Sequence, residues 1–321
     1  MYILIAGGAG FLGSWLCDRL IKNGHRVLCV DNLLSGRKEN IKHLLSIKTF
    51  TFWDVDINSE VFINKASRLK NVDEIYHLAS PASPNKNSPK SYMQFPVETL
   101  LANSIGTYHL IELAINQKAK FLFASSSEIY GEPKEHPQKE TYFGNVNPHG
   151  LRSCYDEGKR FGEAITFAYI RKYGLNARVV RIFNTYGPRM DIDDGRVVSN
   201  FIVSAIKNLP ISIFGTGKQT RSFCYVSDLI DGLEYAMSKE ETSGEVFNLG
   251  NDGEFSILEL IGIIETLLGK NLARHFLPLP TDDPSRRRPD LSKAQKILKY
   301  NPQISLKEGL SKTIDYFKSI L

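Results

Sequence analysis

The chain has 321 residues, of which 42% are hydrophobic and 23% are charged, a composition that fits a soluble globular protein and excludes a disordered or fibrous chain. Its 40 lysines and arginines exceed its 35 acidic residues by five, and this charge is spread along the sequence, so it suits small anionic substrates as well as nucleic acid. No apolar run approaches the roughly 18 residues of a membrane-crossing helix, and residues 1–10 lack the basic start of a signal peptide.

Strand and helix signals alternate along the first half of the chain. Short apolar runs predict strands at 2–6, 26–31, 49–55, 72–79 and 120–125, and helical spacing predicts helices at 11–23 and 97–116. This alternation favours right-handed βαβ crossovers and a parallel sheet covered on both faces. A helix at 155–172 and a strand at 177–183 follow, and after about residue 188 shorter elements mix with polar, Gly- and Pro-rich segments.

Three glycines follow the first predicted strand and open the first predicted helix. Gly7, Gly10 and Gly13 provide a tight turn, close approach of the backbone to a pyrophosphate, and close packing of helix on strand. The helix N-terminus offers free N–H groups and a partial positive charge to the phosphates. The glycines alone leave open a simple glycine-rich turn, but with strand, helix and a following acid in place they predict a dinucleotide site.

Two acidic residues at strand ends extend this prediction. Asp31 ends the second predicted strand 18 residues after Gly13, where its carboxylate can accept hydrogen bonds from both ribose hydroxyls and would repel a 2′-phosphate. The predicted cofactor is therefore NAD rather than NADP. Asp54, at the end of the third strand, is a candidate for the adenine, with a surface acid as the alternative. We predict an α/β fold, a Rossmann-type doubly wound sheet in an NAD-binding domain at 1–188, and a smaller intertwined substrate-binding lobe mainly at 189–321.

Tyr155 and Lys159 lie four residues apart on one predicted helical face. A phenol with a pKa near 10 is a poor base at neutral pH. We expect the ammonium of Lys159 and the positive nicotinamide ring of NAD⁺ to lower the pKa of Tyr155, so that it removes a hydroxyl proton while carbon gives a hydride to the cofactor. Lys159 is also a candidate to hold the nicotinamide ribose.

A polar segment follows the buried strand at 120–125. In a parallel sheet such residues face the ligand crevice, so the Ser126 hydroxyl can share the substrate proton with Tyr155. Glu128 becomes a candidate general acid or base if burial raises its pKa. A serine-rich turn with a solvated glutamate is the alternative.

Together these residues resemble the extended short-chain dehydrogenase/reductase superfamily, and within it most closely the UDP-glucuronate decarboxylases, also called UDP-xylose synthases. The resemblance runs from Gly7 to about Phe317. Its specific blocks lie at 77–84, 144–148, 152–160, 181–190, 194–201, 219–226 and 282–290.

The resemblance assigns site residues position by position. It implies that Tyr155 is the base, that Lys159 is its partner, that Ser126 and Glu128 belong to the family's Thr-Ser-Glu triplet, and that Arg287 is a functional arginine. It implies substrate contacts at Ser83, Tyr169, Asn184, Gln219, Arg221 and Arg287. It implies cofactor contacts at Gly7, Gly10, Phe11, Leu12, Gly13, Asp31, Asn32, Ser35, Gly36, Asp54, Val55, Leu78, Ser80, Tyr155, Lys159, Thr185 and Arg196.

The chain departs from the family pattern at several positions. Ser126 replaces the usual threonine but keeps the hydroxyl, while Phe143, His149 and Leu151 replace other residue types. The segment 85–96 is longer than in typical members and lies near the expected sugar site. The arginines at 286–288 would otherwise indicate a solvated basic loop, and we expect one of them to meet the ligand.

The implied reaction is the decarboxylation of UDP-glucuronate to UDP-xylose. Tyr155 takes the O4 proton while C4 gives its hydride to NAD⁺, the resulting β-keto acid loses CO₂, and C5 is protonated before hydride returns. Glu128 is expected to handle the proton at C5. Arg287 is expected to hold the diphosphate or the distorted sugar, or to stabilise the enolate, because a tight grip on the substrate carboxylate would oppose decarboxylation.

Other functions remain as alternatives. A nucleotide-sugar 4-epimerase needs only the first oxidation and stays open, whereas a 4,6-dehydratase needs an aspartic acid where Ser127 stands. A catalytically inactive NAD-sensing scaffold would be expected to lose Tyr155 or Lys159, and a nucleic-acid binder would show a basic stripe with aromatics.

The remaining expectations concern partners and location. The resemblance implies a homodimer formed through the helices at 97–116 and 155–172. Four scattered cysteines, with no C-x-x-C pair, predict neither a disulfide framework nor a metal site: Cys17, Cys29, Cys154 and Cys224. We therefore expect a cytoplasmic enzyme that uses NAD, no metal, no nucleic acid and no membrane.

Overall fold

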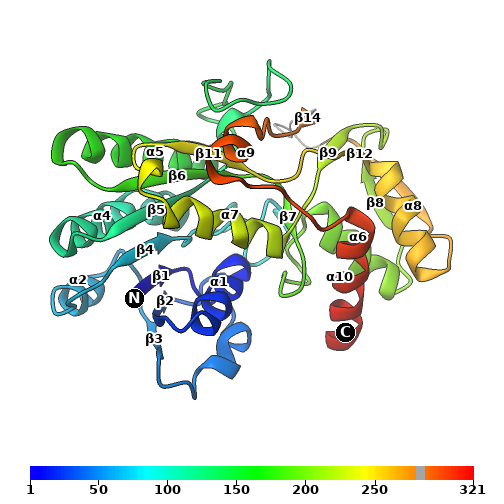
Figure 1. The fold of residues 1–321 in the computed structure, drawn as a ribbon. Helices are drawn as coiled ribbons and strands as arrows, with labels where there is room; N and C mark the ends of the chain where they lie inside the picture. The colour runs from blue at the N-terminus through cyan, green and yellow to red at the C-terminus, as the bar shows by residue number, and fades with distance from the viewer. Residues whose placement is uncertain (280–285) are drawn as a thin grey trace.

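A seven-stranded parallel sheet forms the centre of the computed structural model, which describes residues 1–279 and 286–321 (Figure 1). The strand order is β11-β6-β5-β4-β1-β2-β3, which confirms the predicted doubly wound sheet. Its strands are β1 (Tyr2–Ala6), β2 (Arg26–Asp31), β3 (Phe50–Asp54), β4 (Glu74–His77), β5 (Lys120–Ser126), β6 (Ala177–Ile182) and β11 (Val246–Leu249).

Alternation along each strand divides the core into two layers. Ile3 and Ile5 of β1 pack into one hydrophobic cluster, and Leu4 and Ala6 into the other. The first cluster includes side chains of α1 (Phe11–Lys22), α7 (Val226–Ser238) and α9 (Ser292–Leu298). The second includes side chains of α2 (Glu60–Ala66), α4 (Ile105–Gln117) and α5 (Ser153–Tyr173). Both faces of the sheet are therefore covered, as its continuous apolar strands require.

A smaller lobe stands beside the carboxyl ends of the strands, at the right of Figure 1. It contains α6 (Val197–Ile206), α8 (Ile257–Leu268), α10 (Leu306–Ile320), the parallel pair β8 (Ile211–Phe214) and β13 (Arg274–Leu277), and the sheet β12-β9-β14, with β9 at Thr220–Ser222, β12 at Glu254–Ser256 and β14 at Arg286–Arg287. A short parallel pair, β7 (Thr185–Tyr186) and β10 (Cys224–Tyr225), joins the two parts. Three elements that come after residue 188 belong with the large sheet: β11 is one of its strands, and α7 and α9 cover one of its faces. A domain boundary at 188 stays a prediction.

The helix predicted at 97–116 is two helices. They are α3 (Pro96–Asn103) and α4, and they break at Ser104, whose backbone leaves the regular helical geometry with φ −115° and ψ −79°. The Ser104 hydroxyl donates a hydrogen bond back to the Leu100 carbonyl at 2.7 Å, a local bond that competes with regular helix. Three short 3₁₀ helices were not predicted: η1 (Lys38–Leu44), η2 (Ser127–Tyr130) and η3 (Glu240–Thr242).

Other features concern the whole described chain. Within residues 1–279 and 286–321, no helix has the length and apolarity needed to cross a membrane, and no group of three His, Cys, Asp or Glu side chains is arranged to hold a metal ion. All four cysteines are buried free thiols.

Candidate active site

The turn between β1 and α1 has no room for side chains at two of its glycines. Gly7 has φ +80°, and a Cβ there would lie 2.6 Å from the Ala79 nitrogen, while a Cβ at Gly13 would lie 2.1 Å from the Gly7 oxygen. The helix α1 begins after Gly10, and no side chain within the described residues caps its first turn. Its free N–H groups and partial positive charge fit a pyrophosphate.

Asp31 is fixed at the carboxyl end of β2, beside this turn. Its Oδ2 accepts a hydrogen bond from the Ala9 N–H at 2.9 Å, and its Oδ1 accepts one from the Leu33 N–H at 2.8 Å. Burial raises the pKa of Asp31, and these backbone hydrogen bonds oppose the rise. The carboxylate is therefore preformed where the sequence predicted contact with a ribose.

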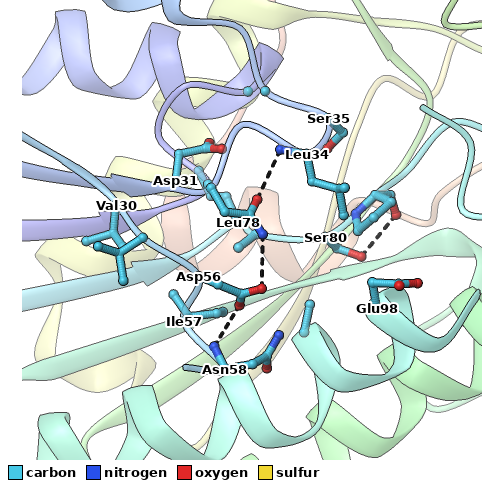
Figure 2. Close-up of a pocket in the computed structure, with 18 residues that line it drawn as sticks. Val30, Asp31, Leu34, Ser35, Asp56, Ile57, Asn58, Leu78, Ser80 and Glu98 are labelled. Carbon is cyan, nitrogen blue, oxygen red and sulfur yellow. Dashed lines mark hydrogen bonds between the residues drawn. The ribbon is translucent and has the colours of Figure 1, made fainter. Parts of the chain in front are cut away.

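A cavity lies over the carboxyl ends of β1 to β4, at the point where the strand order reverses (Figure 2). Most of the predicted cofactor residues line it: Gly7, Gly10, Asp31, Asn32, Ser35, Gly36, Val55, Leu78 and Ser80. Phe11, Leu12, Gly13, Asp54, Thr185 and Arg196 lie outside the set of described residues that line this cavity. The uncapped helix, the glycine turn and the fixed carboxylate fit a dinucleotide.

Asp56 lines the cavity, whereas the predicted Asp54 does not. Asp54 is exposed at the end of β3, opposite Asp31 in the parallel pairing. Asp56 accepts hydrogen bonds from the Asn32 side chain at 3.1 Å and from the Asn58 N–H at 2.8 Å (Figure 2). Both acids lie in the sequence Asp54-Val55-Asp56. The end of the predicted strand therefore identified the right segment, but the prediction chose Asp54 where the structure has Asp56. Contact of Asp54 with an adenine stays a prediction.

Tyr155, Lys159 and Ser126 meet at the end of β5. The hydroxyls of Tyr155 and Ser126 are hydrogen-bonded to each other. The Nζ atom of Lys159 donates a hydrogen bond to the Ala124 carbonyl at 2.8 Å and lies 5.7 Å from the centre of the Tyr155 ring. The helix α5 places both residues on one face, as the four-residue spacing predicted.

The predicted lowering of the Tyr155 pKa is wrong for the chain alone. Burial raises the pKa of Tyr155 to about 12, although the hydrogen bond from Ser126 and the charge of Arg196 oppose the rise. Burial also lowers the pKa of Lys159 to about 7, against the charge of Glu163. Desolvation disfavours the charged forms of both side chains. The sequence pattern does not reveal how deeply they are buried, so this effect was missed.

Glu128 forms ion pairs with two arginines from distant segments. Oε1 lies 2.6 Å from Nη1 of Arg287, Oε2 accepts a hydrogen bond from Nη2 at 3.0 Å, and Arg152 also donates to Oε2. Burial raises the pKa of Glu128, but the charges of Arg152, Arg287 and Arg221 together lower it by more. The net effect is a pKa below its usual value. The expectation that burial raises the Glu128 pKa on balance is therefore wrong, and the role of Glu128 as general acid or base stays a prediction. The carboxylate stays ionised.

Arg287 lies where the two lobes meet. The strand β14 pairs in parallel with β9, so Arg287 lies opposite Arg221, and its Nη1 donates to the Asn184 side chain at 3.3 Å. Arg287, Arg221 and Asn184 thus form one group with Glu128, and their contact with a substrate stays a prediction. The part of the specific block at 282–285 lies outside the described residues.

The remaining predicted residues have other contacts. Ser83 donates a hydrogen bond to the Asp194 carbonyl, and Asp194 forms an ion pair with Arg196, whose charge acts on Tyr155. Thr185 donates to the Phe183 carbonyl at 2.8 Å, and Gln219 donates to the Phe214 carbonyl at 2.6 Å. These contacts leave the ligand roles of Ser83, Thr185, Arg196 and Gln219 as predictions.

The assignment of Tyr169 to the substrate site needs correction. Tyr169 follows Tyr155 by 14 residues in α5, which places it about 21 Å along the helix axis. Its hydroxyl donates a hydrogen bond to Glu112 of α4 at 2.5 Å. The structure therefore separates Tyr169 from the group around Tyr155.

Besides Asp56 and Arg152, two residues close to the catalytic tyrosine were not predicted. The Tyr92 ring stacks on the Tyr155 ring, with centres 5.0 Å apart and planes 13° apart. Asp156 is buried next to Tyr155 and interacts with Glu128. Tyr92 could have been found from its place in the long segment at 85–96, and Asp156 from its place next to Tyr155 in the sequence.

The chain matches a known family over most of its length. The model of the NAD dependent epimerase/dehydratase family matches residues 3–250. The chain belongs to this family. UDP-glucuronic acid decarboxylase 1 of Arabidopsis thaliana is 48% identical over 317 residues, which are 99% of this chain and 70% of that protein. The Danio rerio protein of the same name is 48% identical over 98% of this chain and 72% of its own length.

Solved structures of epimerases/dehydratases share the fold. UDP-glucose 4-epimerase of Thermotoga maritima has a TM-score of 0.90 at 32% identity and covers 100% of this chain and 99% of its own. UDP-glucuronic acid 4-epimerase of Bacillus cereus, solved with UDP-glucuronic acid and NAD, has a TM-score of 0.89 at 30% identity and covers 100% of both chains. The resemblance seen in the sequence and the NAD cofactor are confirmed.

Proposed function

We propose that the protein catalyses NAD-dependent decarboxylation of UDP-glucuronate to UDP-xylose, with the cofactor regenerated in each cycle. The observation that carries this proposal is the group of Arg152, Arg221 and Arg287 around a single ionised Glu128, beside Tyr155. Its surplus positive charge suits a substrate that carries both a carboxylate and a diphosphate. Relatives 48% identical over 98–99% of this chain are named UDP-glucuronic acid decarboxylases, which supports this substrate.

The residues around the cavity fit NAD. The N-terminus of α1 would hold the pyrophosphate and Asp31 a ribose, as their free N–H groups and fixed carboxylate suggest. When bound, NAD⁺ supplies the hydride acceptor and a positive charge close to the phenol. That charge opposes the desolvation which raises the Tyr155 pKa to about 12.

The side chains at the end of β5 then move one proton. Tyr155 takes the proton from O4 of the sugar, and the Ser126 hydroxyl stabilises the phenolate through its hydrogen bond. Oxidation at C4 places a ketone β to the carboxylate, so the C5–C6 electron pair can pass to the ketone oxygen as CO₂ leaves. C5 then takes one proton, which restores the ketone, and Tyr155 returns its own proton to O4 when the ketone is reduced.

Arg287 serves this reaction best as a stabiliser of the negative charge that develops. Both of its terminal nitrogens already bond to Glu128, which compensates part of its charge and fixes its direction. A weaker grip on the substrate carboxylate avoids stabilising the ground state, and binding that favours the transition state accelerates the reaction.

A 4-epimerase is the second candidate, because a UDP-glucuronic acid 4-epimerase shares the fold at TM-score 0.89 over the full chain. The test is incubation of the purified protein with NAD⁺ and UDP-glucuronate, with CO₂ measured and the product sugar identified by NMR. We expect CO₂ and UDP-xylose in equal amounts. The C4 epimer of UDP-glucuronate without CO₂ would establish the epimerase instead.

We also propose that the protein is a cytoplasmic homodimer. Large apolar side chains are exposed along α3 and the neighbouring parts of α4 and α5: Val97, Leu100, Ile105, Tyr108 and Phe161. Apolar side chains gathered on neighbouring helices, unlike apolar residues scattered singly over a surface, suit pairing with a second copy. The four free thiols suit a reducing compartment. Sedimentation equilibrium of wild type and Val97→Asp tests the dimer, and we expect the variant to be monomeric.

A further inference from the structure

Arg287 belongs to β14, a strand of only two residues at the edge of the sheet β12-β9-β14. Its guanidinium has a defined position, because Nη1 lies 2.6 Å from Oε1 of Glu128 and Nη2 donates to Oε2 at 3.0 Å. Pairing with β9 gives so short a strand few backbone hydrogen bonds. Other contacts are therefore needed to fix the backbone from which the Arg287 side chain extends.

Gln138 supplies such contacts to the residues that follow β14. Its backbone N–H donates a hydrogen bond to the Arg288 carbonyl at 2.9 Å, and its carbonyl accepts one from the Asp290 N–H at 2.8 Å. These bonds form a parallel bridge between Gln138 and Pro289. The side chain adds a third bond, since its Oε1 accepts a hydrogen bond from the Arg288 N–H at 2.9 Å. Three hydrogen bonds of normal length thus fix the chain immediately after Arg287.

Gln138 is itself held firmly in the interior. It is only 1% exposed, and its Nε2 donates a hydrogen bond to the Glu135 carbonyl at 2.7 Å. Its own carbonyl also accepts a hydrogen bond from Nδ2 of Asn248 at 3.0 Å, and Asn248 belongs to β11 of the large sheet. A buried amide that uses both its oxygen and its nitrogen within the protein has one favoured orientation. Gln138 can therefore serve as a rigid support.

A chain of buried hydrogen bonds continues from Asn248 to α5, the helix that carries Tyr155. Oδ1 of Asn248 accepts a hydrogen bond from the Tyr130 hydroxyl at 2.8 Å, and that hydroxyl accepts one from Nη1 of Arg181 at 2.9 Å. Arg181 in turn donates two hydrogen bonds to Glu163 of α5, at 3.0 and 2.8 Å. The support of Arg287 is thus tied to the helix that places the tyrosine.

We propose that Gln138 is a positioning residue that sets Arg287 against Glu128 for the loss of CO₂. This inference rests on the proposed decarboxylation. Gln138 acts through the backbone at Arg288, and Arg287 is the residue that faces the reacting atoms. A guanidinium on a long, flexible side chain stabilises developing charge best when its backbone is fixed, because its fork then keeps one direction. Without Oε1 of Gln138, the Arg288 N–H loses its partner and the segment after β14 can shift.

The test measures Gln138→Met, which keeps the length of the side chain but removes both of its hydrogen-bonding atoms. We expect kcat for CO₂ release from UDP-glucuronate to fall at least fivefold, because Arg287 no longer faces the developing charge from a fixed position. KM for UDP-glucuronate and the affinity for NAD should stay within twofold of wild type. Gln295→Met, the same change at an exposed position of α9, should match wild type throughout.

A double-mutant cycle with Arg287→Lys separates positioning from general support of the fold. If Gln138 acts through Arg287, then Gln138→Met should lower kcat less than twofold once Arg287→Lys is present, because the contact that it positions is already lost. Gln138→Asn keeps a buried amide but shortens the side chain by one carbon, which takes its oxygen away from the Arg288 N–H. It should give the same pattern, and it keeps the proposal testable if Gln138→Met does not fold.

Other results would overturn the proposal. A kcat within twofold of wild type in Gln138→Met would show that Arg287 keeps its position without this side chain. Equal losses of kcat in the presence and absence of Arg287→Lys would show that Gln138 supports the fold in general. A fall in NAD affinity as large as the fall in kcat would lead to the same conclusion. Absence of CO₂ from the wild-type reaction would instead refute the proposed function, a result distinct from all of these.

Discussion

The cofactor half and the sugar half of the site are built in different ways. The cofactor half is centred on the first 31 residues, where a glycine turn, an uncapped helix and Asp31 present mainly backbone groups, and later strand ends complete the cavity. The sugar half consists of side chains from distant segments, since Arg287 of the smaller lobe meets the Glu128–Arg152 pair of the large lobe only when the lobes pack together. The first half is a product of local structure and the second of the tertiary fold. Tyr155 lies where the two meet.

Replacing Tyr155 tests that meeting point and should have the largest effect. Tyr155→Phe keeps the ring that stacks on Tyr92 but removes the group that carries the O4 proton. We expect kcat to fall about 10³-fold, within the usual range for loss of a general base, with the affinity for NAD unchanged. Steady-state CO₂ release and NAD titration measure the two quantities.

Tyr169→Phe is the matched control, because it removes the same hydroxyl from the same helix far from Tyr155. It should retain wild-type activity. A comparable loss of kcat in Tyr169→Phe would restore Tyr169 to the site and contradict the placement of these residues.

A methyl group at Gly13 tests the cofactor half. A Cβ there would lie 2.1 Å from the Gly7 oxygen, so the turn must move. Overpacking typically costs about 1–3 kcal/mol, and we expect NAD to bind about a hundredfold more weakly, measured by calorimetry. Gly262→Ala in α8 is the control, since its Cβ would meet no atom within 4 Å and the change favours helix. Equal NAD affinity in both variants would show that the turn is not rigid.

The difference between the halves explains what the sequence predicted. The strands, the glycine turn, Asp31 and the Tyr155–Lys159 spacing are local patterns, and the structure shows each of them. The direction of the Glu128 pKa was missed because Arg287 lies 159 residues away along the chain. The break at Ser104 was missed because the apolar spacing continues across it, so helical periodicity does not reveal it.

Replacing Arg287 tests the sugar half alone. Arg287→Lys keeps the charge but loses the two parallel bonds to Glu128, because an ammonium cannot bond both oxygens with the same geometry. Hydrogen bonds to charged groups contribute about 1.5–3 kcal/mol, and we expect kcat to fall at least tenfold while NAD binding is unchanged. Arg286→Lys, at the exposed neighbouring position, should behave as wild type. Weaker NAD binding in Arg287→Lys would show that the halves are not separate.

The smallest effect, a change in stability, is expected from removing the ion pair between the segment 85–96 and the chain that follows β7. Nζ of Lys90 lies 2.7 Å from Oδ2 of Asp191, and Nη1 of Arg37 lies 4.0 Å from the same oxygen. The Lys90 and Asp191 side chains are 31% and 19% exposed, so solvent weakens the pair, and we expect Lys90→Ala to cost at most about 1 kcal/mol in urea unfolding. Arg37 keeps Asp191 partly compensated.

The pH dependence of this small effect distinguishes an ion pair from packing. Burial raises the pKa of Asp191. The hydrogen bonds from Lys90 and the Asp193 N–H and the charges of Lys90 and Arg37 together lower it by more, so the pKa lies below its usual value. The folded form therefore gains stability from this carboxylate above the unfolded pKa of about 3.9 and loses it as pH falls through the lower folded value. The difference between wild type and Lys90→Ala should shrink to zero over that acidic range. A difference that persists there would belong to packing of the aliphatic stem of Lys90 instead of its charge.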